Sequence, residues 1–219
     1  MDAIINILPE LNKAFFETIY MVGIAILIAL LIGMPLGIVL YVTDNGLILE
    51  NRFIKSVAGI ITNLVRSIPF IILLVFLLPF TNLLLGTQIG PTAAAVPLSI
   101  AAIPFFARMV ESSAREIDRG VIEAAVSVGA KPWTIIKDII LPEAKPGIVS
   151  GLTITIISLI GYSAMAGTVG GGGIGDLAIR YGYYRYDNVV MYTTVVVLIV
   201  LVQVIQFSGD FIAKKINKR

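Results

Sequence analysis

The chain has 219 residues, of which 58% are hydrophobic and only 14% are charged, and its mean hydropathy is +0.96. This composition differs strongly from that of a soluble globular domain and predicts an integral membrane protein. The net charge of +2 is too small to indicate a nucleic-acid partner, and the absence of Cys and His excludes disulfides, zinc sites, thiol nucleophiles and imidazole bases.

The first predicted membrane crossing covers residues 18–42, an uncharged run that exceeds the about 20 residues required by a hydrocarbon core. The preceding residues are charged and lack the pattern of a cleaved secretory signal, so we expect this helix to remain in the mature protein. Gly33 and Gly37 form a pair of small residues four apart that favours close packing of another helix. A hinge at the intervening Pro35 is the alternative.

The second and third crossings are expected within residues 67–107, which contain no charge and would form a helix of about 60 Å, enough for two crossings. Polar and helix-breaking residues cluster at 79–91 and predict a break between crossings over 67–85 and 91–107. Arg66 directly precedes the first of these. Because a basic side chain at mid-bilayer costs about 2.5–3.5 kcal/mol, we expect Arg66 near an interface. The alternative is that Arg66 lines a pathway through the membrane or meets a partner.

Residues 108–145 form the one long polar interruption and hold 12 of the 30 charged side chains. Apolar residues at helical spacing predict two short amphipathic helices here. They are Val121, Ile122, Ala125 and Val126 in the first helix, and Ile135, Ile136, Ile139 and Ile140 in the second. Gly129 suits a left-handed helix C-terminus and Pro132 suits the first turn of the next helix, so the segment reads as helix, turn and helix. Pro142 should end the second helix at Leu141.

The fourth and fifth crossings are expected over residues 146–166 and 188–207, followed by a basic tail over 208–219. A connection rich in Gly and Tyr separates them. Its glycines match G-x-G-x-x-G, but no strand precedes them, so we expect a flexible turn and not a phosphate site. The tyrosines that follow are expected at the level of the lipid headgroups.

Five crossings place the two termini on opposite sides of the membrane. If residues 108–145 are cytoplasmic, the inner segments hold 13 Lys and Arg residues and the outer segments hold 3. This asymmetry predicts an N-terminus outside and a C-terminus inside. The predicted fold class is therefore an all-α integral membrane protein with five transmembrane helices and a cytoplasmic helix-turn-helix loop.

The polar segment resembles the EAA loop of ABC importer membrane subunits. The residues that match the pattern are Glu123, Ala124, Ala125, Gly129, Ile139, Leu141 and Pro142. In that family the loop is the cytoplasmic coupling helix, which docks into a groove on the ATP-hydrolysing subunit. An amphipathic hairpin lying on the membrane surface is the alternative, but such a hairpin favours a polar face rich in Lys and Arg, and this one carries both signs.

Segments 66–75, 104–111 and 161–183 resemble the permease subunit of methionine ABC importers, and the likeness covers residues 15–206 as one ABC transmembrane type-1 domain. The resemblance implies a homodimer in the cytoplasmic membrane of a bacterium, assembled with two ATPase subunits and an external substrate-binding lipoprotein. It implies import of L- and D-methionine by alternating access. The chain itself would be no enzyme and bind no cofactor, because ATP and Mg²⁺ would bind to the partner ATPase subunit.

The resemblance assigns ATPase coupling to the matching residues Glu123, Ala124, Ala125, Gly129, Leu141 and Pro142. On chemical grounds alone, the substrate-pathway candidates are Ser67, Pro69, Tyr162, Ser163 and Met165. Alternative functions are import of another small amino acid or short peptide, an ion-coupled secondary transporter, and a scaffold without a pathway. The predicted crossings lack the acids or histidines that normally bind a coupling ion, which argues against a secondary transporter. Ser, Thr, Gly and Pro within the helices favour a pathway over a scaffold.

Overall fold

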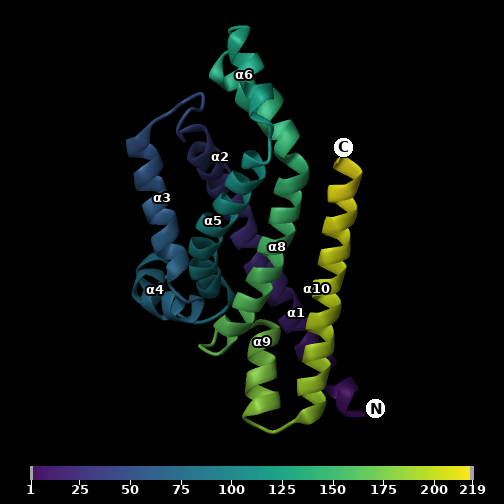
Figure 1. Cartoon of the computed structure of the whole chain (residues 1–219). Helices are drawn as coiled ribbons and strands as arrows, with labels where there is room; N and C mark the ends of the chain where they lie inside the picture. Colours follow the sequence, from purple (N-terminus) through teal and green to yellow (C-terminus); the bar gives the residue numbers. More distant parts are fainter. Residues whose placement is uncertain (1, 218–219) are drawn as a thin grey trace.

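Helices form all the regular secondary structure in residues 2–217, the part of the chain that the computed structural model describes (Figure 1). In chain order they are α1 (Asp2–Ile28), the π-helical turn η1 (Ala29–Gly33), α2 (Met34–Val42), α3 (Arg52–Ser67), α4 (Phe70–Leu85), α5 (Pro91–Arg115), α6 (Arg119–Ser127), α7 (Pro132–Ile135), η2 (Ile136–Ile140), α8 (Leu141–Gly167), α9 (Gly173–Leu177), η3 (Ala178–Tyr183) and α10 (Asn188–Ile216). By length and composition, this part of the chain holds four spans, or five if α3 and α4, bent by 105° at their junction, form one. The predicted all-α membrane protein is confirmed.

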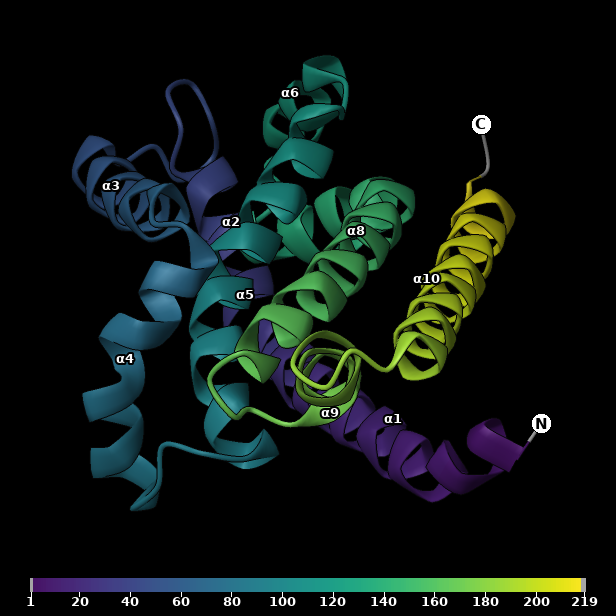
Figure 2. The same ribbon diagram turned by 90° about the horizontal axis from the view of Figure 1, so that it is seen from below.

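Helix α5 occupies the centre of the molecule, where α1, α2, α3, α4 and α8 pack against it (Figure 2). Its side chains Leu98, Ala102, Phe106 and Val110 follow helical spacing and are at most 1% exposed. The short helix α9 packs against α1 and α8, whereas α10 lies to one side, against α8 and η3. Most of the α10 surface is apolar and exposed, as a helix that faces lipid requires.

Two glycines allow the N-terminal helix to approach α5 closely. A Cβ atom at Gly33 would lie 2.8 Å from the carbonyl oxygen of Ile103, and one at Gly37 would lie 2.5 Å from that of Ala107. Any larger residue would therefore separate the two backbones. The predicted role of this pair in helix packing is confirmed.

The prediction that Pro142 ends a helix is wrong. Residues 132–167 form one continuous helix because η2, a π-helical turn, directly precedes Pro142. The backbone N–H of Leu141 donates to the carbonyl of Ile136, five residues back, and this wider turn accommodates a residue that lacks an N–H and would clash in a regular α-helix. Turn η1 precedes Pro35 in the same way, so neither proline breaks its helix.

The glycine-rich connection differs from the expected flexible turn, because it is hydrogen-bonded to α1. The Gly173 N–H donates to Glu17 Oε2 at 2.8 Å, and the Ile174 N–H donates to Thr18 Oγ1 at 3.0 Å. A Cβ atom at Gly175 would overlap the backbone of Ala164. The glycines thus permit close packing of α9 between α1 and α8.

Several helices extend beyond the predicted crossings. The helix that contains residues 18–42 begins at Asp2, α5 continues to Arg115, and α10 continues to Ile216. Much of the predicted polar loop therefore belongs to the ends of long helices. The final tail residues, Lys218 and Arg219, lie outside the described part of the chain.

Candidate functional site

Helix α6 projects from one end of the molecule, and α9 and the N-terminus lie at the other end (Figure 1). Two stems carry it, namely the C-terminal end of α5 and the continuous helix formed by α7, η2 and α8. The stems pack against each other along α5 and α8. Any force applied to α6 therefore acts directly on the two central helices.

Both ends of α6 are defined by capping contacts. At its start, Asp118 Oδ1 accepts a hydrogen bond from the Gly120 N–H at 2.7 Å. At its end, the Gly129 N–H donates to the Val126 carbonyl at 2.9 Å, and the Ala130 N–H donates to the Ala125 carbonyl at 3.1 Å. Gly129 has a φ of +77°, so the predicted left-handed glycine at this turn is confirmed.

One side of α6 packs on the stems and the other side is open. Ile122 and Ala125 are buried in the same apolar cluster as Ile135 and Ile140 of the second stem. Val121 and Val126, which share the predicted apolar face, are 46% and 52% exposed. About half of each of these two side chains is therefore left open by residues 2–217.

Four apolar residues of α6, the turn after it and α7 are exposed, and we call them together the α6 tip: Val121, Val126, Val128 and Trp133. Val128 is 83% exposed and Trp133 is 70% exposed. Exposed apolar residues near charged ones are a feature of protein-binding surfaces when they form one patch. Val128 and Trp133 are not among the predicted coupling residues, although an apolar residue in a turn and the one Trp of the chain were the available signals.

The six predicted coupling residues fall into two groups. Glu123, Ala124 and Gly129 are exposed on α6 and its turn, whereas Ala125 is buried against the stems. The other two, Leu141 and Pro142, lie on the second stem where η2 meets α8, and Leu141 packs against the core. Of the six, Glu123, Ala124, Gly129 and Pro142 are therefore exposed, whereas Ala125 and Leu141 pack against the rest of the fold.

Of the five pathway candidates, only Tyr162 lines the cavity at the junction of α3 and α4. This cavity has a volume of about 130 Å³ and is lined by Arg66, Phe70 and Tyr162, among others. The rings of Phe70 and Tyr162 are stacked, with centroids 4.6 Å apart and planes 6° apart. Arg66 reaches this cavity as an exposed side chain.

The remaining pathway candidates do not line this cavity. Ser67 and Pro69 are exposed beside it, and the Ser67 hydroxyl donates to the Asn63 carbonyl at 2.8 Å. Ser163 is buried and donates to the carbonyl of Ile160 on its own helix at 2.8 Å, so its hydroxyl is satisfied locally. Met165 is 44% exposed.

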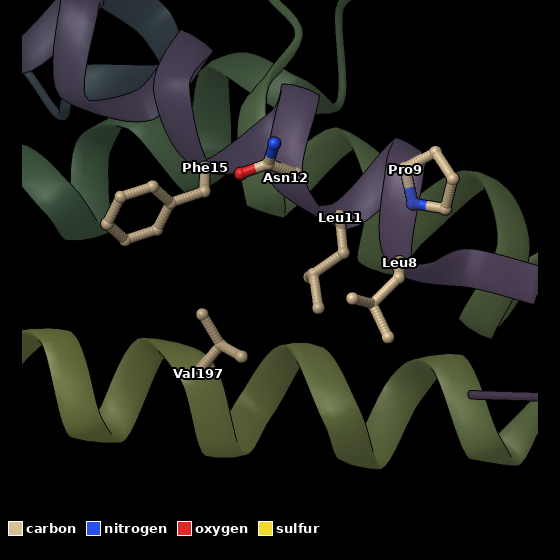
Figure 3. Close-up of a pocket in the computed structure, with 6 residues that line it drawn as sticks. All are labelled: Leu8, Pro9, Leu11, Asn12, Phe15 and Val197. Atoms are coloured by element: carbon tan, nitrogen blue, oxygen red, sulfur yellow. The ribbon is translucent and has the colours of Figure 1, made fainter. Parts of the chain in front are cut away.

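A larger cavity, of about 440 Å³, lies between the N-terminal part of α1 and α10 (Figure 3). Leu8 and Leu11 point from α1 toward α10, where Val197 points back at them. Asn12 is the one polar residue in the lining. A crevice without charge on the outside of the helix group suits lipid chains and does not suit a zwitterionic solute.

Comparison with known proteins agrees with this geometry. Residues 29–219 match the family model described as binding-protein-dependent transport system inner membrane component. The chain belongs to this family. Since the match includes the stems, α6 and the α3–α4 junction, the features described above are those of an inner-membrane transport component.

Individual members of the family are similar over nearly the whole chain. A probable D-methionine transport system permease protein, MetI, from Vibrio cholerae is 50% identical over 209 residues, which cover 95% of this chain and 93% of the relative. The methionine import system permease protein MetP from Bacillus subtilis is 46% identical, covering 97% and 96%. A crystal form of the MetNI methionine ABC transporter in inward-facing conformations contains a chain with 46% identity and a TM-score of 0.95, covering 97% and 99%.

Proposed function

We propose that this chain is the permease subunit of an ATP-driven importer that moves methionine, in its L and D forms, across the bacterial cytoplasmic membrane. The observation that carries the proposal is the exposed α6, held on two stems that run into the centre of the molecule. Relatives named for methionine transport, at 46–50% identity over almost the full chain, support the substrate.

In this proposal, α6 is the coupling helix that docks into a groove on a separate ATPase subunit. Glu123 and Ala124 face the partner, Ala125 fixes α6 to its stems, and Gly129 sets the turn. Leu141 and Pro142 support the second stem. The exposed α6 tip, which lies beyond the other helices, supplies the apolar contact area.

The proposed topology has five crossings, with the α3–α4 pair counted as one broken span. Residues 15–206 form one permease domain, and residues 208–219 form the cytoplasmic tail. The excess of Lys and Arg on the α6 side supports a cytoplasmic α6, an internal C-terminus and an external N-terminus.

The proposed assembly is a homodimer of this chain with two ATPase subunits and an external binding lipoprotein, surrounded by membrane lipid. ATP and Mg²⁺ bind to the ATPase subunits, and this chain performs no catalysis. Closure of the two ATPase subunits on ATP displaces α6 and shifts the helices from an inward-open to an outward-open arrangement. Ser67, Pro69, Tyr162, Ser163 and Met165 are proposed pathway residues, and the junction cavity that Tyr162 lines supports this for Tyr162.

The test is ATP hydrolysis by the chain purified with its ATPase subunit in lipid nanodiscs, with and without binding protein loaded with methionine. We expect methionine-loaded binding protein to stimulate turnover, because binding that favours the outward-open state also favours ATPase closure. If binding protein loaded with another amino acid or a peptide stimulates turnover and methionine does not, that compound is the substrate. Failure of any ATPase subunit to co-purify would contradict the importer class.

A further inference from the structure

A carboxylate on α5 is almost fully buried and meets three cations. The Glu111 side chain is 3% exposed. Its Oε1 accepts from Lys55 Nζ at 2.7 Å and from Arg115 Nη2 at 2.9 Å, and its Oε2 accepts from Arg108 Nη1 at 2.6 Å. We call these residues, together with Asp44, the Glu111 network.

The network joins four separate parts of the chain. Lys55, in the first turn of α3, also donates to the Leu40 carbonyl on α2 at 2.7 Å and lies 3.4 Å from Asp44 Oδ2. Arg108 donates through Nη2 to Asn63 Oδ1, further along α3, at 2.8 Å. The network therefore contacts α3 at both its first turn and its C-terminal half.

The loop between α2 and α3 is attached to α5 by the same network. Asp44 accepts a hydrogen bond from Arg115, which also binds Glu111. Burial alone would raise the pKa of Asp44, but the hydrogen bonds from Arg115 and the Asn45 backbone, together with the charge of Lys55, lower it below its usual value. Asp44 is therefore a stable anion at neutral pH.

Few other contacts hold α3 in place. Thr62 is the one buried residue of α3, and its hydroxyl has no hydrogen-bond partner in the described structure. Large apolar side chains of α3, such as Phe53 and Leu64, are 76% and 62% exposed. Since little apolar surface of α3 is buried, the side-chain hydrogen bonds of the network, from Lys55 to Glu111 and from Arg108 to Asn63, are important contacts between α3 and α5.

The network lies between the two parts of the candidate site. After Arg115, the chain continues through residues 116–118 into α6. Beyond Asn63, α3 leads to Arg66 and the cavity at the α3–α4 junction. Helices α3 and α5 pack against each other, so a movement of α6 can reach the junction through α5 and α3.

We infer that Glu111 is a positioning residue for coupling, which makes α3 follow α5 so that displacement of α6 reaches the α3–α4 junction. A buried ion pair contributes little net stability, because desolvation offsets the attraction between the charges. Its main effect here is geometric, since one carboxylate fixes three basic groups carried by two helices. The inference rests on the proposed function, because it assigns a role within the same transport cycle.

Glu111→Gln and Lys55→Met test the inference in the complete transporter, reconstituted with its ATPase subunit and methionine-loaded binding protein in liposomes. ATP hydrolysis and methionine uptake are measured on the same vesicles. We expect both variants to keep hydrolysing ATP but to lower methionine uptake per ATP at least about fivefold, the lower range of typical coupling between sites. Lys55→Arg, which keeps the charge, should restore most of the uptake.

Arg52→Met is the matched control. Arg52 lies on the first turn of α3, as Lys55 does, but is 84% exposed and its nearest carboxylate, on Glu50, is 3.9 Å away. It should leave the uptake per ATP unchanged. A parallel loss of hydrolysis and uptake in the test variants, or no change in either, would overturn the inference. If Glu111→Gln prevents assembly of the complex, methionine uptake per ATP in the Lys55→Met and Lys55→Arg variants tests the inference.

A distance measurement separates this inference from the proposed function. The chain contains no Cys, so spin labels can be placed at exposed positions Phe53 on α3 and Ser112 on α5. In the Glu111→Gln complex we expect the distance between the labels to broaden or shift on ATP binding, whereas it stays constant in the parent. If the distance distributions on ATP binding are the same in the parent and the Glu111→Gln complex, the inference is overturned. If the parent complex transports no methionine, the proposed function fails and this measurement still tests the network.

Discussion

At the scale of single residues, Gly129 owes its proposed place in the coupling site to its backbone conformation alone. Its φ of +77° is one that residues with a side chain rarely adopt, yet nothing lies within 4 Å of the position that its Cβ would occupy. Substitution therefore strains the turn after α6 without causing a clash. The strained backbone costs about 1–2 kcal/mol, and this cost falls in the turn that follows α6.

We predict that Gly129→Asp leaves the chain inserted in the membrane and lowers its affinity for the ATPase subunit. Co-purification with the ATPase subunit measures this, with membrane insertion checked by fractionation. Gly86→Asp is the control, because Gly86 has a φ of +72° and equally open surroundings but follows α4, far along the chain from α6. Failure of Gly129→Asp to insert would make Gly129 a folding residue and remove it from the coupling site.

At the scale of helices, close packing of the N-terminal helix on α5 depends on Gly37. We predict that Gly37→Leu lowers the thermal stability of the purified chain, with an overpacking cost of about 1–3 kcal/mol, because the neighbour is backbone and cannot move aside. Thermal unfolding in detergent measures the effect. Gly23→Leu is the control, since no atom lies within 4 Å of a Cβ there; equal melting temperatures for the two variants would contradict this account.

The helices themselves could be predicted from sequence because their determinants are local. Uncharged runs indicate the long helices, and the glycines at 33, 37, 86 and 129 indicate packing or turns from their immediate context. The prediction of a helix end at Pro142 was wrong because a π-helical turn just before it accommodates the proline ring. Such a turn has no simple sequence pattern.

Long-range polar contacts could not be predicted, because their partners are distant in sequence. Glu111 and Lys55 are 56 residues apart, and Glu17 and Gly173 are 156 residues apart. Each charge taken alone reads as an ordinary residue near a membrane interface. Only the packing of α1, α3, α5 and α9 reveals that these carboxylates bind specific partners.

At the scale of the whole molecule, the orientation in the membrane connects the fold to the direction of transport. The Val128 side chain in the turn after α6 and the Tyr186 side chain between η3 and α10 are 83% and 86% exposed. Figure 1 shows α6 and the connection between α9 and α10 at opposite ends of the molecule. The excess of basic residues near α6 favours placing that end in the cytoplasm, where ATP is available.

We therefore predict that a membrane-impermeant thiol reagent added to intact cells labels Tyr186→Cys and not Val128→Cys. The native chain has no Cys, so each variant presents one reactive site on an exposed side chain. Permeabilised cells provide the control, because both variants should then react. Labelling of Val128→Cys in intact cells would place α6 outside, where it could not reach an ATPase subunit, and would exclude coupling by ATP hydrolysis through this helix.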